Sequence, residues 1–268
     1  MDKLIEIPLK PNLTPAFILE GTLKEYSTED LHYHSCHQFL RISTGITLLV
    51  EEKEKQPLFS NMTAFIPAGL PHRSSVMGTI VNYKSIYLDE NLFNPAINEI
   101  VIFDMSELGV ALFNRINLSQ NKTDGISLQC LNLLLELMKK EIHFKSSLTH
   151  IPVPRNPENR KITEYIENNF EKKLTLSEVT NVLHYSDRHI SRIFKEDLKV
   201  SIFEYLKLYR IFQSALKLCE SNSSETITSI AFSCGYDSLS SFYKDFREIF
   251  SMTPKMFKQK NRRTIKSF

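Results

Sequence analysis

The sequence lacks a long hydrophobic run: in its 268 residues no apolar stretch reaches the roughly 18–20 residues that a helix needs to cross a bilayer. Residues 1–6 also lack the long apolar core of a signal peptide. These two absences argue against a membrane protein and against a secreted one. We therefore expect a cytoplasmic protein that has no membrane partner.

Cysteine is scarce and scattered. The four cysteines are Cys36, Cys130, Cys219 and Cys234, and no two of them form a CxxC pair. This spacing argues against a disulfide framework and against a zinc-finger module. We expect buried, reduced thiols.

Charge is nearly balanced over the whole chain, with a net charge of +2, but it is unevenly placed. Residues 1–154 contain 13 Lys and Arg against 17 Asp and Glu, which gives −4. Residues 155–268 contain 20 against 14, which gives +6. The length is sufficient for two domains with separate cores. The basic excess in one region favours a polyanionic partner for that region alone.

Residues 1–90 carry a strand pattern, because short apolar or alternating runs separated by turn residues span 38–44, 45–50, 64–66 and 80–88. Residues 95–115 and 127–144 then change to helical spacing. The apolar stripe of the second segment consists of Leu128, Leu131, Leu134, Leu135, Met138 and Ile142. The stripe either packs on its own domain or pairs with a second subunit, so residues 91–150 form a helical section with a candidate role in dimerisation.

A proline-rich segment over residues 151–157 marks the clearest boundary. Pro152, Pro154 and Pro157 oppose both helix and sheet, so we expect a stiff, extended linker. Residues 158–268 have few glycines, repeated caps and helical periodicity, which predicts an all-α domain. The fold class is therefore α+β multidomain, with a strand-rich domain and trailing helices before the linker.

Two short capped helices are predicted over residues 174–198. Thr175, with Glu178 three residues later, forms a capping box that begins a helix over 176–183. Ser186 then caps a second helix that runs to about Leu198. Two short helices joined by a tight turn are typical of a helix-turn-helix unit.

The second of these helices has two unlike faces when its residues are placed ~100° apart. One face carries Ile190, Ile193, Phe194 and Asp197. The opposite face carries Arg188, Arg192, Lys195 and Lys199. A basic face suits the major groove of DNA, because lysine and arginine neutralise phosphates and arginine reaches guanine O6 and N7. The alternative is a solvated basic face on an ordinary helix.

A second unit over residues 226–250 repeats the pattern. Thr226 caps a helix over 227–234, and Gly235 stands where the turn needs a positive φ. Asp237 or Ser238 caps a helix to about Phe250. Its buried stripe is expected to be Leu239, Phe242, Phe246 and Ile249, with Ser240, Ser241 and Lys244 on the other side. A long connecting helix over 201–219, with Phe203 among its packing positions, would hold the two recognition helices ~34 Å apart, one turn of B-DNA.

Residues 158–259 resemble the DNA-binding domain of the AraC family. The resemblance rests on residues 186–195 (SDRHISRIFK), on Ile230-Ala231, Gly235-Tyr236 and Ser240-Ser241-Phe242, and on residues 250–254 (FSMTP). It implies binding to specific double-stranded DNA. It further implies contacts from Arg188, Ser191 and Arg192 in the first unit and from Ser240, Ser241 and Lys244 in the second. Lys195 is expected to contact phosphate.

The sequence departs from the AraC pattern at two positions. Thr180 stands where the family usually has alanine, and Ser251 stands where it usually has glycine. A threonine at that tight helix contact is expected to loosen the first unit without removing it.

Two histidine motifs lie in the strand-rich region. Residues 32–38 (HYHSCHQ) form an HxHxxxQ pattern, and residues 67–72 (PAGLPH) form a PxGxxH pattern. His32, His34 and Gln38 share one parity and therefore one face of a strand. Aimed into a barrel and met by His72, they either bind a divalent metal or line a metal-free effector pocket. His37 has the opposite parity and is expected to be exposed.

Residues 15–90 resemble cupin domains through this pair of motifs. They also resemble the sensor domains of one AraC-type subgroup in which HxHxxxQ is followed by PxGxxH. The resemblance implies a β-barrel or jelly roll that holds one small ligand. Gln38 replaces the usual cupin glutamate and Asn61 the usual leading glycine. A neutral amide is a weaker metal ligand than a carboxylate.

These features favour a transcription regulator over an enzyme. A small effector or a divalent metal in the N-terminal domain would control DNA binding or activation, and the expected partners are double-stranded DNA, a second copy in a homodimer and, as a further candidate, RNA polymerase.

Two other hypotheses stay open. A cupin enzyme, such as a metal-dependent oxygenase or isomerase, is supported by His32, His34 and His72, but no carboxylate joins them and no acid/base pair is evident. A regulator with an empty barrel would instead respond through partner exchange at the 127–144 stripe.

Overall fold

The computed structural model describes residues 5–6, 16–24, 30–52, 54–119, 122–123, 125–143, 150–181, 183, 185–219 and 225–262. Residues 1–4 and 263–268, at the ends of the expected first and last domains, and residue 144, at the end of an expected helix, lie outside the described residues. The chain divides into two compact units. Unit 1 contains residues 1–49, 58–146 and 264–268, and unit 2 contains residues 50–57 and 147–263. Within the described part of the chain, every helix is too short or too polar to serve as a membrane span.

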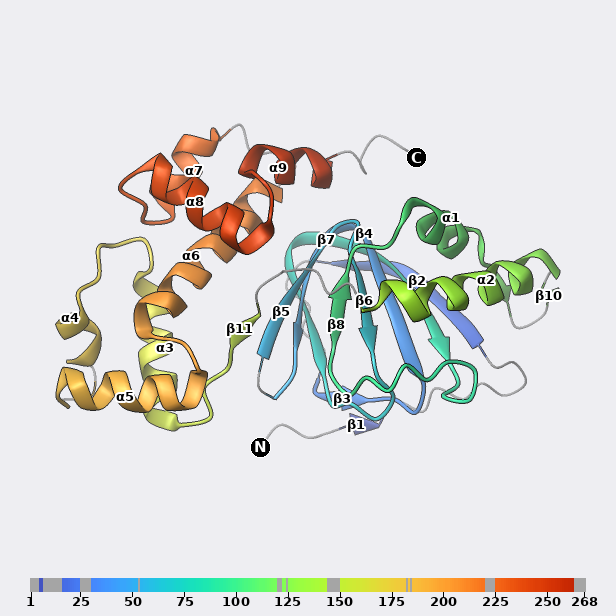
Figure 1. Ribbon diagram of the computed structural model, residues 1–268, viewed down its shortest axis with the longest axis horizontal. Coiled ribbons are helices and arrows are strands. Elements are labelled where there is room, and N and C mark those ends of the chain that lie inside the picture. The colour runs from blue at the N-terminus through green and yellow to red at the C-terminus, as the bar shows by residue number, and fades with distance from the viewer. Residues whose placement is uncertain are drawn as a thin grey trace. The chain divides into compact units, whose positions relative to one another are not determined.

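The strands are antiparallel over most of unit 1 (Figure 1). In chain order the chain forms β1 (Ile5–Glu6), β2 (Ala16–Lys24), β3 (His32–Tyr33), β4 (His37–Val50), β5 (Glu54–Phe59), β6 (Thr63–Ile66), β7 (Arg73–Leu88), β8 (Val101–Phe103), β9 (Leu118–Ser119), β10 (Lys122–Thr123) and β11 (Ile151–Pro152). Strand β4 pairs with β6, β6 pairs with β8, and β7 pairs with both β2 and β4. The expected strands are confirmed, and 38–44 and 45–50 form one continuous strand, β4.

Gly45 changes the face that the side chains of β4 reach. Before it, Ile42 lines an internal cavity, whereas after it Thr47 and Leu49, of opposite parity, line the same cavity. Such a switch requires an extra residue in the strand, as in a β-bulge. Gly45 has a φ of +85°, and a Cβ there would lie 2.1 Å from the carbonyl oxygen of Ile80. Only glycine permits this approach of the two backbones.

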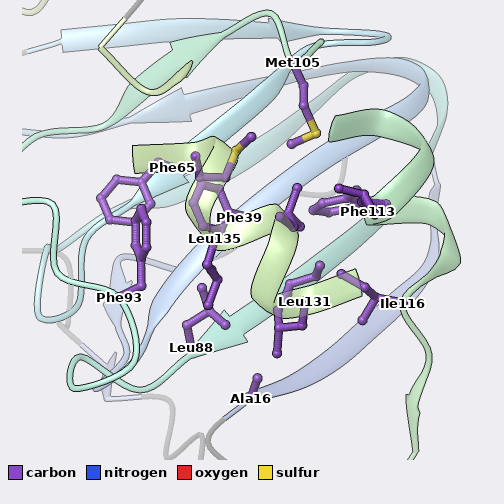
Figure 2. Packing of buried hydrophobic residues seen from close by; sticks show 14 of the residues in the cluster. Ala16, Phe39, Phe65, Leu88, Phe93, Met105, Phe113, Ile116, Leu131 and Leu135 are labelled. Atoms are coloured by element: carbon purple, nitrogen blue, oxygen red, sulfur yellow. The ribbon is translucent and has the colours of Figure 1, made fainter. Parts of the chain in front are cut away.

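The main core of unit 1 lies between the sheet and two helices, α1 (Glu107–Arg115) and α2 (Gly125–Glu141). Figure 2 shows Phe39 of the sheet beside Leu135 of α2 and Leu131 of α2 beside Ile116. The ring centroids of Phe39 and Phe65 are 5.2 Å apart. Because Phe39 and Leu40 have opposite parity, the two faces of the sheet bury different side chains: one face packs on the helices and the other lines the cavity.

The two helical segments expected before the linker behave differently. In α2 the stripe packs on its own unit, since Leu131, Leu134, Leu135, Met138 and Ile142 are buried and only Leu128 is exposed, at 44%. The expectation of helix throughout 95–115 is wrong, because Val101–Phe103 forms strand β8 and only Glu107–Arg115 is helical. A short, fully buried apolar run suits either state, so its periodicity does not distinguish strand from helix.

Unit 2 is helical apart from β11 and the start of β5. Its helices are α3 (Pro157–Asn169), α4 (Leu176–Thr180), α5 (Asp187–Leu198), α6 (Ile202–Cys219), α7 (Ile227–Ser233), α8 (Leu239–Phe250) and α9 (Pro254–Arg262). The proline-rich segment is not purely a linker. Ile151 and Pro152 pair with Lys55 and Glu54 of β5, which proline permits at the edge of a sheet. Pro157 begins α3, where its missing N–H is not needed.

Candidate nucleic-acid interface and ligand pocket

Side-chain caps position the first helix-turn-helix unit, which spans α4 and α5. The expected capping box is present: the Glu178 N–H donates to the Thr175 Oγ1 at 3.3 Å, and the Thr175 N–H donates to the Glu178 carboxylate at 2.7 Å. Ser186 caps α5 by accepting from the His189 N–H at 3.4 Å. Helix α4 ends at Thr180, before the expected residue 183.

Thr180 joins the two helices of this unit. It is 1% exposed, and its Oγ1 donates to the carboxylate of Asp187 in the first turn of α5. The Ser177 hydroxyl donates to the same carboxylate at 3.4 Å. A hydrogen bond to an ionised acceptor is stronger than a neutral one. The contact therefore argues against the loosening expected from a threonine at this position.

One face of α5 is held inside unit 2. Ile190, Phe194 and Leu198 are buried, and Ile193 and Asp197 are half-buried. The carboxylate of Asp197 accepts from the Asn156 N–H at 3.1 Å and from the Asn159 Nδ2 at 2.9 Å, at the start of α3. Sequence reasoning missed these asparagines, which fix the orientation of α5 about its own axis.

The opposite face of α5 is exposed and mainly basic. Its exposed side chains include Arg188, Arg192 and Lys195, and Ser191 is half-buried. Glu196 lies beside them, and both of its carboxylate oxygens accept from Arg192 at 2.9 Å. Lys199 is the C-cap of α5 and donates from Nζ to the Glu196 carbonyl oxygen at 2.7 Å. The basic face thus includes one acid that the sequence analysis missed, although its i,i+4 spacing from Arg192 indicates such a pair.

The helices of the second helix-turn-helix unit, α7 and α8, are capped in the same manner. Thr226 accepts from the Ser229 N–H at 3.0 Å, and Ser238, rather than Asp237, caps α8 by accepting from the Ser241 N–H at 3.2 Å. Gly235 has the expected positive φ, +81°. A Cβ at Gly235 would lie 2.5 Å from the Phe170 carbonyl oxygen, so the tight turn excludes a side chain here.

The exposed face of α8, in the second helix-turn-helix unit, is more polar than basic. Phe242, Phe246, Ile249 and Phe250 are buried. Leu239 is half-buried, and Ser240, Ser241, Lys244 and Arg247 are exposed. Cys234 is buried in the turn, and this burial raises the pKa of its thiol to about 11. The thiol is therefore protonated at neutral pH.

Helix α6 connects the two helix-turn-helix units. It has 18 residues, which corresponds to a length of about 27 Å. Arg210 on α6 donates to the carbonyl oxygens of Phe170 at 2.8 Å and Lys172 at 2.7 Å. Its guanidinium also lies 5.9 Å from the ring centroid of Tyr236. Arg210 therefore contacts segments next to both helix-turn-helix units. Phe203, expected to pack, is 46% exposed.

The histidines of the two N-terminal motifs come together in unit 1. His32 and His72 face each other across an isolated antiparallel bridge, with backbone hydrogen bonds of 2.9 and 2.8 Å. The ring centroids lie 4.5 Å apart for His32 and His72 and 5.0 Å apart for His34 and His72. The structure therefore gathers side chains that are about forty positions apart in the chain.

Each imidazole is held through its Nδ1 by a backbone carbonyl oxygen. The pairs are His32 with Asp30 at 2.8 Å, His34 with Cys36 at 2.6 Å and His72 with Leu70 at 2.8 Å. A carbonyl oxygen only accepts, so the hydrogen is on Nδ1. Burial lowers the pKa of His34, and it lowers the pKa of His72 to about 3, so the His72 ring is neutral at pH 7. The Nε2 of neutral His72 is then a hydrogen-bond acceptor.

Gln38 is buried at the same end of the cavity. Its Nε2 donates to the Ser85 Oγ at 2.8 Å, and its Oε1 lies 3.1 Å from the His34 Nε2. The cavity has a volume of about 180 Å³. His32, Gln38 and His72 line it together with Ser85 and Tyr87 of β7, and its apolar walls include Leu23, Ile42, Leu49 and Val81.

The histidine cluster is also the candidate metal site. Among the described residues, no group of three or more His, Cys, Asp or Glu side chains is arranged to hold a metal ion. No carboxylate is among the described residues that line the cavity, and the amide nitrogen of Gln38 already donates to Ser85. Apolar walls with a few placed polar groups are typical of pockets for small organic ligands.

His37 is not exposed as its parity suggests. It is 6% exposed, its Nδ1 accepts from the Ala68 N–H at 3.0 Å, and its ring centroid lies 5.2 Å from that of Phe65. Both faces of this sheet are covered, so opposite parity moves a side chain into the other buried layer and not into solvent. Cys36 is also buried, at 2% exposed.

Comparisons with known proteins concern mainly the C-terminal region. Residues 179–260 match the family described as a helix-turn-helix domain. An uncharacterized HTH-type transcriptional regulator of Staphylococcus aureus (strain COL) is 30% identical over 128 residues, which cover 47% of this chain and 17% of that protein. The chain therefore spans about a sixth of the length of the curated relatives it matches.

The solved structures that are similar to this chain include two bacterial proteins. A probable AraC family transcriptional regulator from Rhodopseudomonas palustris CGA009 is 28% identical, with 40% of this chain and 99% of that chain covered and a TM-score of 0.38. ToxT from Vibrio cholerae is 12% identical, with 92% of this chain and 98% of that chain covered and a TM-score of 0.38.

Proposed function

We propose that this chain, whose residues 179–260 carry a helix-turn-helix domain of the AraC type, is a transcription regulator that binds specific sites on double-stranded DNA. The proposal rests mainly on how α5 is held in its unit and on which of its side chains stay exposed. Its caps and its buried face fix the helix, while Arg188, Arg192 and Lys195 remain exposed on the other side. Such a helix can enter a major groove without unfolding any part of its unit.

The second helix-turn-helix unit supports the binding of a longer DNA site. Helix α8 repeats the serine cap, the aromatic buried face and an exposed polar face of Ser240, Ser241 and Lys244. Its smaller charge is expected to contribute less to affinity than α5, because each neutralised phosphate adds to binding. Two such helices in neighbouring grooves would cover two blocks of bases about one helical turn apart.

Selection of bound duplexes from random DNA with the full chain tests this proposal. We expect one enriched sequence, and footprinting should show two protected blocks about 10 base pairs apart. The variant with Arg188, Arg192 and Lys195 all changed to alanine should keep its circular dichroism spectrum and enrich nothing. If the unaltered chain protects no site at any salt concentration, the proposal fails.

We further propose that the cavity of unit 1 holds the small effector that controls DNA binding. The support is a cavity of about 180 Å³ with both polar and apolar walls. Control requires that the effector bind one arrangement of the chain more tightly than another. A change in the apparent DNA affinity on addition of the effector, and a reciprocal change in effector affinity on addition of DNA, would test this coupling.

A homodimer is the proposed working form. The stripe predicted on α2 is occupied within unit 1, but Ile126 and Leu133 on α2 are 55% and 49% exposed and Leu108 on α1 is 52% exposed. Sedimentation of the full chain and of the Leu133→Glu variant tests the proposal. We expect a dimer that the charged variant weakens, and a monomeric unaltered chain would exclude it.

A further inference from the structure

The cavity of unit 1 has no charged side chain in its wall. Asp, Glu, Lys and Arg are all absent from the described residues that line it. An ion that left water for this cavity would find no opposite charge to replace its hydration, so the wall disfavours a charged ligand. The arrangement of His, Cys, Asp and Glu among the described residues also gives no metal-holding group.

His72 offers an acceptor to whatever fills the cavity. Its Nδ1 is held by the Leu70 carbonyl oxygen at 2.8 Å, its side chain lines the cavity, and no described residue bonds its Nε2. The backbone bridge to His32 fixes the main chain at His72. A fixed acceptor that loses its water on ligand binding must be paired, or the unmade hydrogen bond weakens binding.

Polar and apolar groups separate along β7. Val81, Tyr83, Ser85 and Tyr87 share the cavity face, and residues two apart on a strand lie about 7 Å apart, so the Tyr83 ring lies between the aliphatic Val81 and the polar Ser85. At one end Ser85 bonds Gln38 at 2.8 Å, and the Tyr87 ring lies 5.3 Å from that of His34. At the other end Val81 pairs with Leu23 of β2 in a wall of aliphatic side chains. A ligand that fits this wall has one polar end and one apolar end.

The volume suits a ligand of about one ring. The cavity measures about 180 Å³, and a dry apolar cavity of roughly 150 Å³ is known to hold benzene. A ring with one short substituent matches this volume.

We propose that this cavity binds an uncharged molecule about the size of one substituted ring, which donates a hydrogen bond from a hydroxyl or amino group to the Nε2 of His72 and places its apolar body toward Val81. This inference deepens the sensor role in the proposed function. It rests on that role only for the consequence that such a ligand changes DNA binding.

Three probes of similar size test the ligand class on the full chain by calorimetry: benzyl alcohol, toluene and sodium benzoate. We expect saturable binding of benzyl alcohol, about tenfold weaker binding of toluene, which leaves the His72 acceptor unpaired, and no saturable binding of benzoate. Equal affinities of benzyl alcohol and toluene, or tighter binding of benzoate, would overturn the proposal. So would one-to-one binding of zinc chloride that displaces benzyl alcohol.

The variant His72→Phe keeps a ring at this place and removes the acceptor. Its affinity for benzyl alcohol should fall to within about twofold of that for toluene, since one hydrogen bond accounts for the difference. If this variant does not fold, Leu23→Phe fills the apolar end instead, and binding of both neutral probes should be lost. Met256→Ala, at an exposed apolar position on α9, is the control and should change neither affinity.

The failures of the two proposals are distinguishable. If the probes behave as expected but no DNA sequence is enriched, the ligand class holds and the regulator proposal falls. If a DNA site is found but benzyl alcohol and toluene bind alike, the ligand class is wrong and the regulator proposal stands.

Discussion

Ser251 ends α8 in the left-handed region, with a φ of 53°, at the position where the AraC pattern usually has glycine. A side chain in this region costs about 1 kcal/mol relative to glycine because its Cβ crowds the following carbonyl oxygen. We expect Ser251→Gly to raise the free energy of unfolding of unit 2 by up to about 1 kcal/mol, measured by urea denaturation. Lys199, with a φ of 62° at the same place in α5, is the matched site. A loss of stability in Ser251→Gly would contradict this reading of the cap.

Arg192 and Lys195 share the exposed face of α5 but are assigned different tasks. Arg192→Ala should lose about 1–3 kcal/mol of discrimination between the selected site and a site with one changed base pair. Lys195→Ala should weaken all sequences alike and lower the salt dependence of binding by roughly one phosphate contact. Fluorescence anisotropy at several salt concentrations separates the two effects. If Arg192→Ala weakens all sequences equally, its role is a phosphate contact and the assignment is wrong.

At the scale of the element, local sequence predicts well where a helix begins. The capping box of Thr175 and Glu178, the serine cap of α5 and the threonine cap of α7 are all confirmed. Caps are predictable because the cap residue bonds an N–H only two or three positions along the chain. The turn between α4 and α5 was less predictable, since Thr180 reaches Asp187 across it.

Thr180→Val tests whether that hydroxyl holds the first helix-turn-helix unit together. Valine keeps the shape and removes the hydrogen bond to the side chain of Asp187, so we expect unit 2 to lose about 1–2 kcal/mol of stability. Urea denaturation measures the change. Ser177→Ala removes only the longer 3.4 Å bond to the same carboxylate and should cost less. A stability equal to that of the unaltered chain would show that the threonine contributes only packing.

The contact between α3 and α6 is a second test at this scale. The Tyr205 hydroxyl, on a fully buried side chain, donates to Glu167 at 2.6 Å, and Lys55 lies 3.6 Å from the same oxygen. Glu167→Ala should lower the free energy of unfolding of unit 2 by about 1–3 kcal/mol, because it removes the acceptor of a buried hydroxyl. Lys55→Ala should cost less than about 1 kcal/mol, since the ion pair is partly exposed. When Tyr205 is also changed to phenylalanine, Glu167→Ala should cause a smaller loss of stability. An unchanged loss would show that the two side chains do not stabilise each other.

At the scale of the whole molecule, unit 1 should lose stability in mild acid. The pKa of His72 is about 3 in the folded chain against 6.5 when exposed, because burial disfavours the imidazolium. Between these two values the unfolded chain binds a proton that the folded chain does not, so stability falls as the pH falls. The slope is about 1.4 kcal/mol per pH unit, or about 2 kcal/mol from pH 6.5 to pH 5. Denaturation of the unaltered chain and of His72→Gln measures it, and equal slopes would contradict the assignment.

The division into two units also shows where the sequence boundary and the fold differ. Residues 50–57, which run from the last residue of β4 into β5, cluster with residues 147–263, and Ile151 pairs with Lys55. A segment close to the sensor strands in sequence therefore belongs to the unit that carries the helix-turn-helix domain. Composition and proline content locate a linker along the chain, but they do not report which distant segment pairs with it.

By itself the sequence determined the features that depend on neighbours a few positions apart: the caps of α4, α5 and α7, the buried and basic faces of α5, and the glycine turn at Gly235. It also placed His32, His34 and His72 as candidate site residues. Only the tertiary structure decided that α2 packs on its own unit, that residues 101–103 form a strand, that His37 is buried, and that Asp197 and Arg210 hold the helices in place. The physical reason is that these outcomes depend on which surface covers a side chain and which partner accepts its hydrogen bond, and both come from segments far away in the chain.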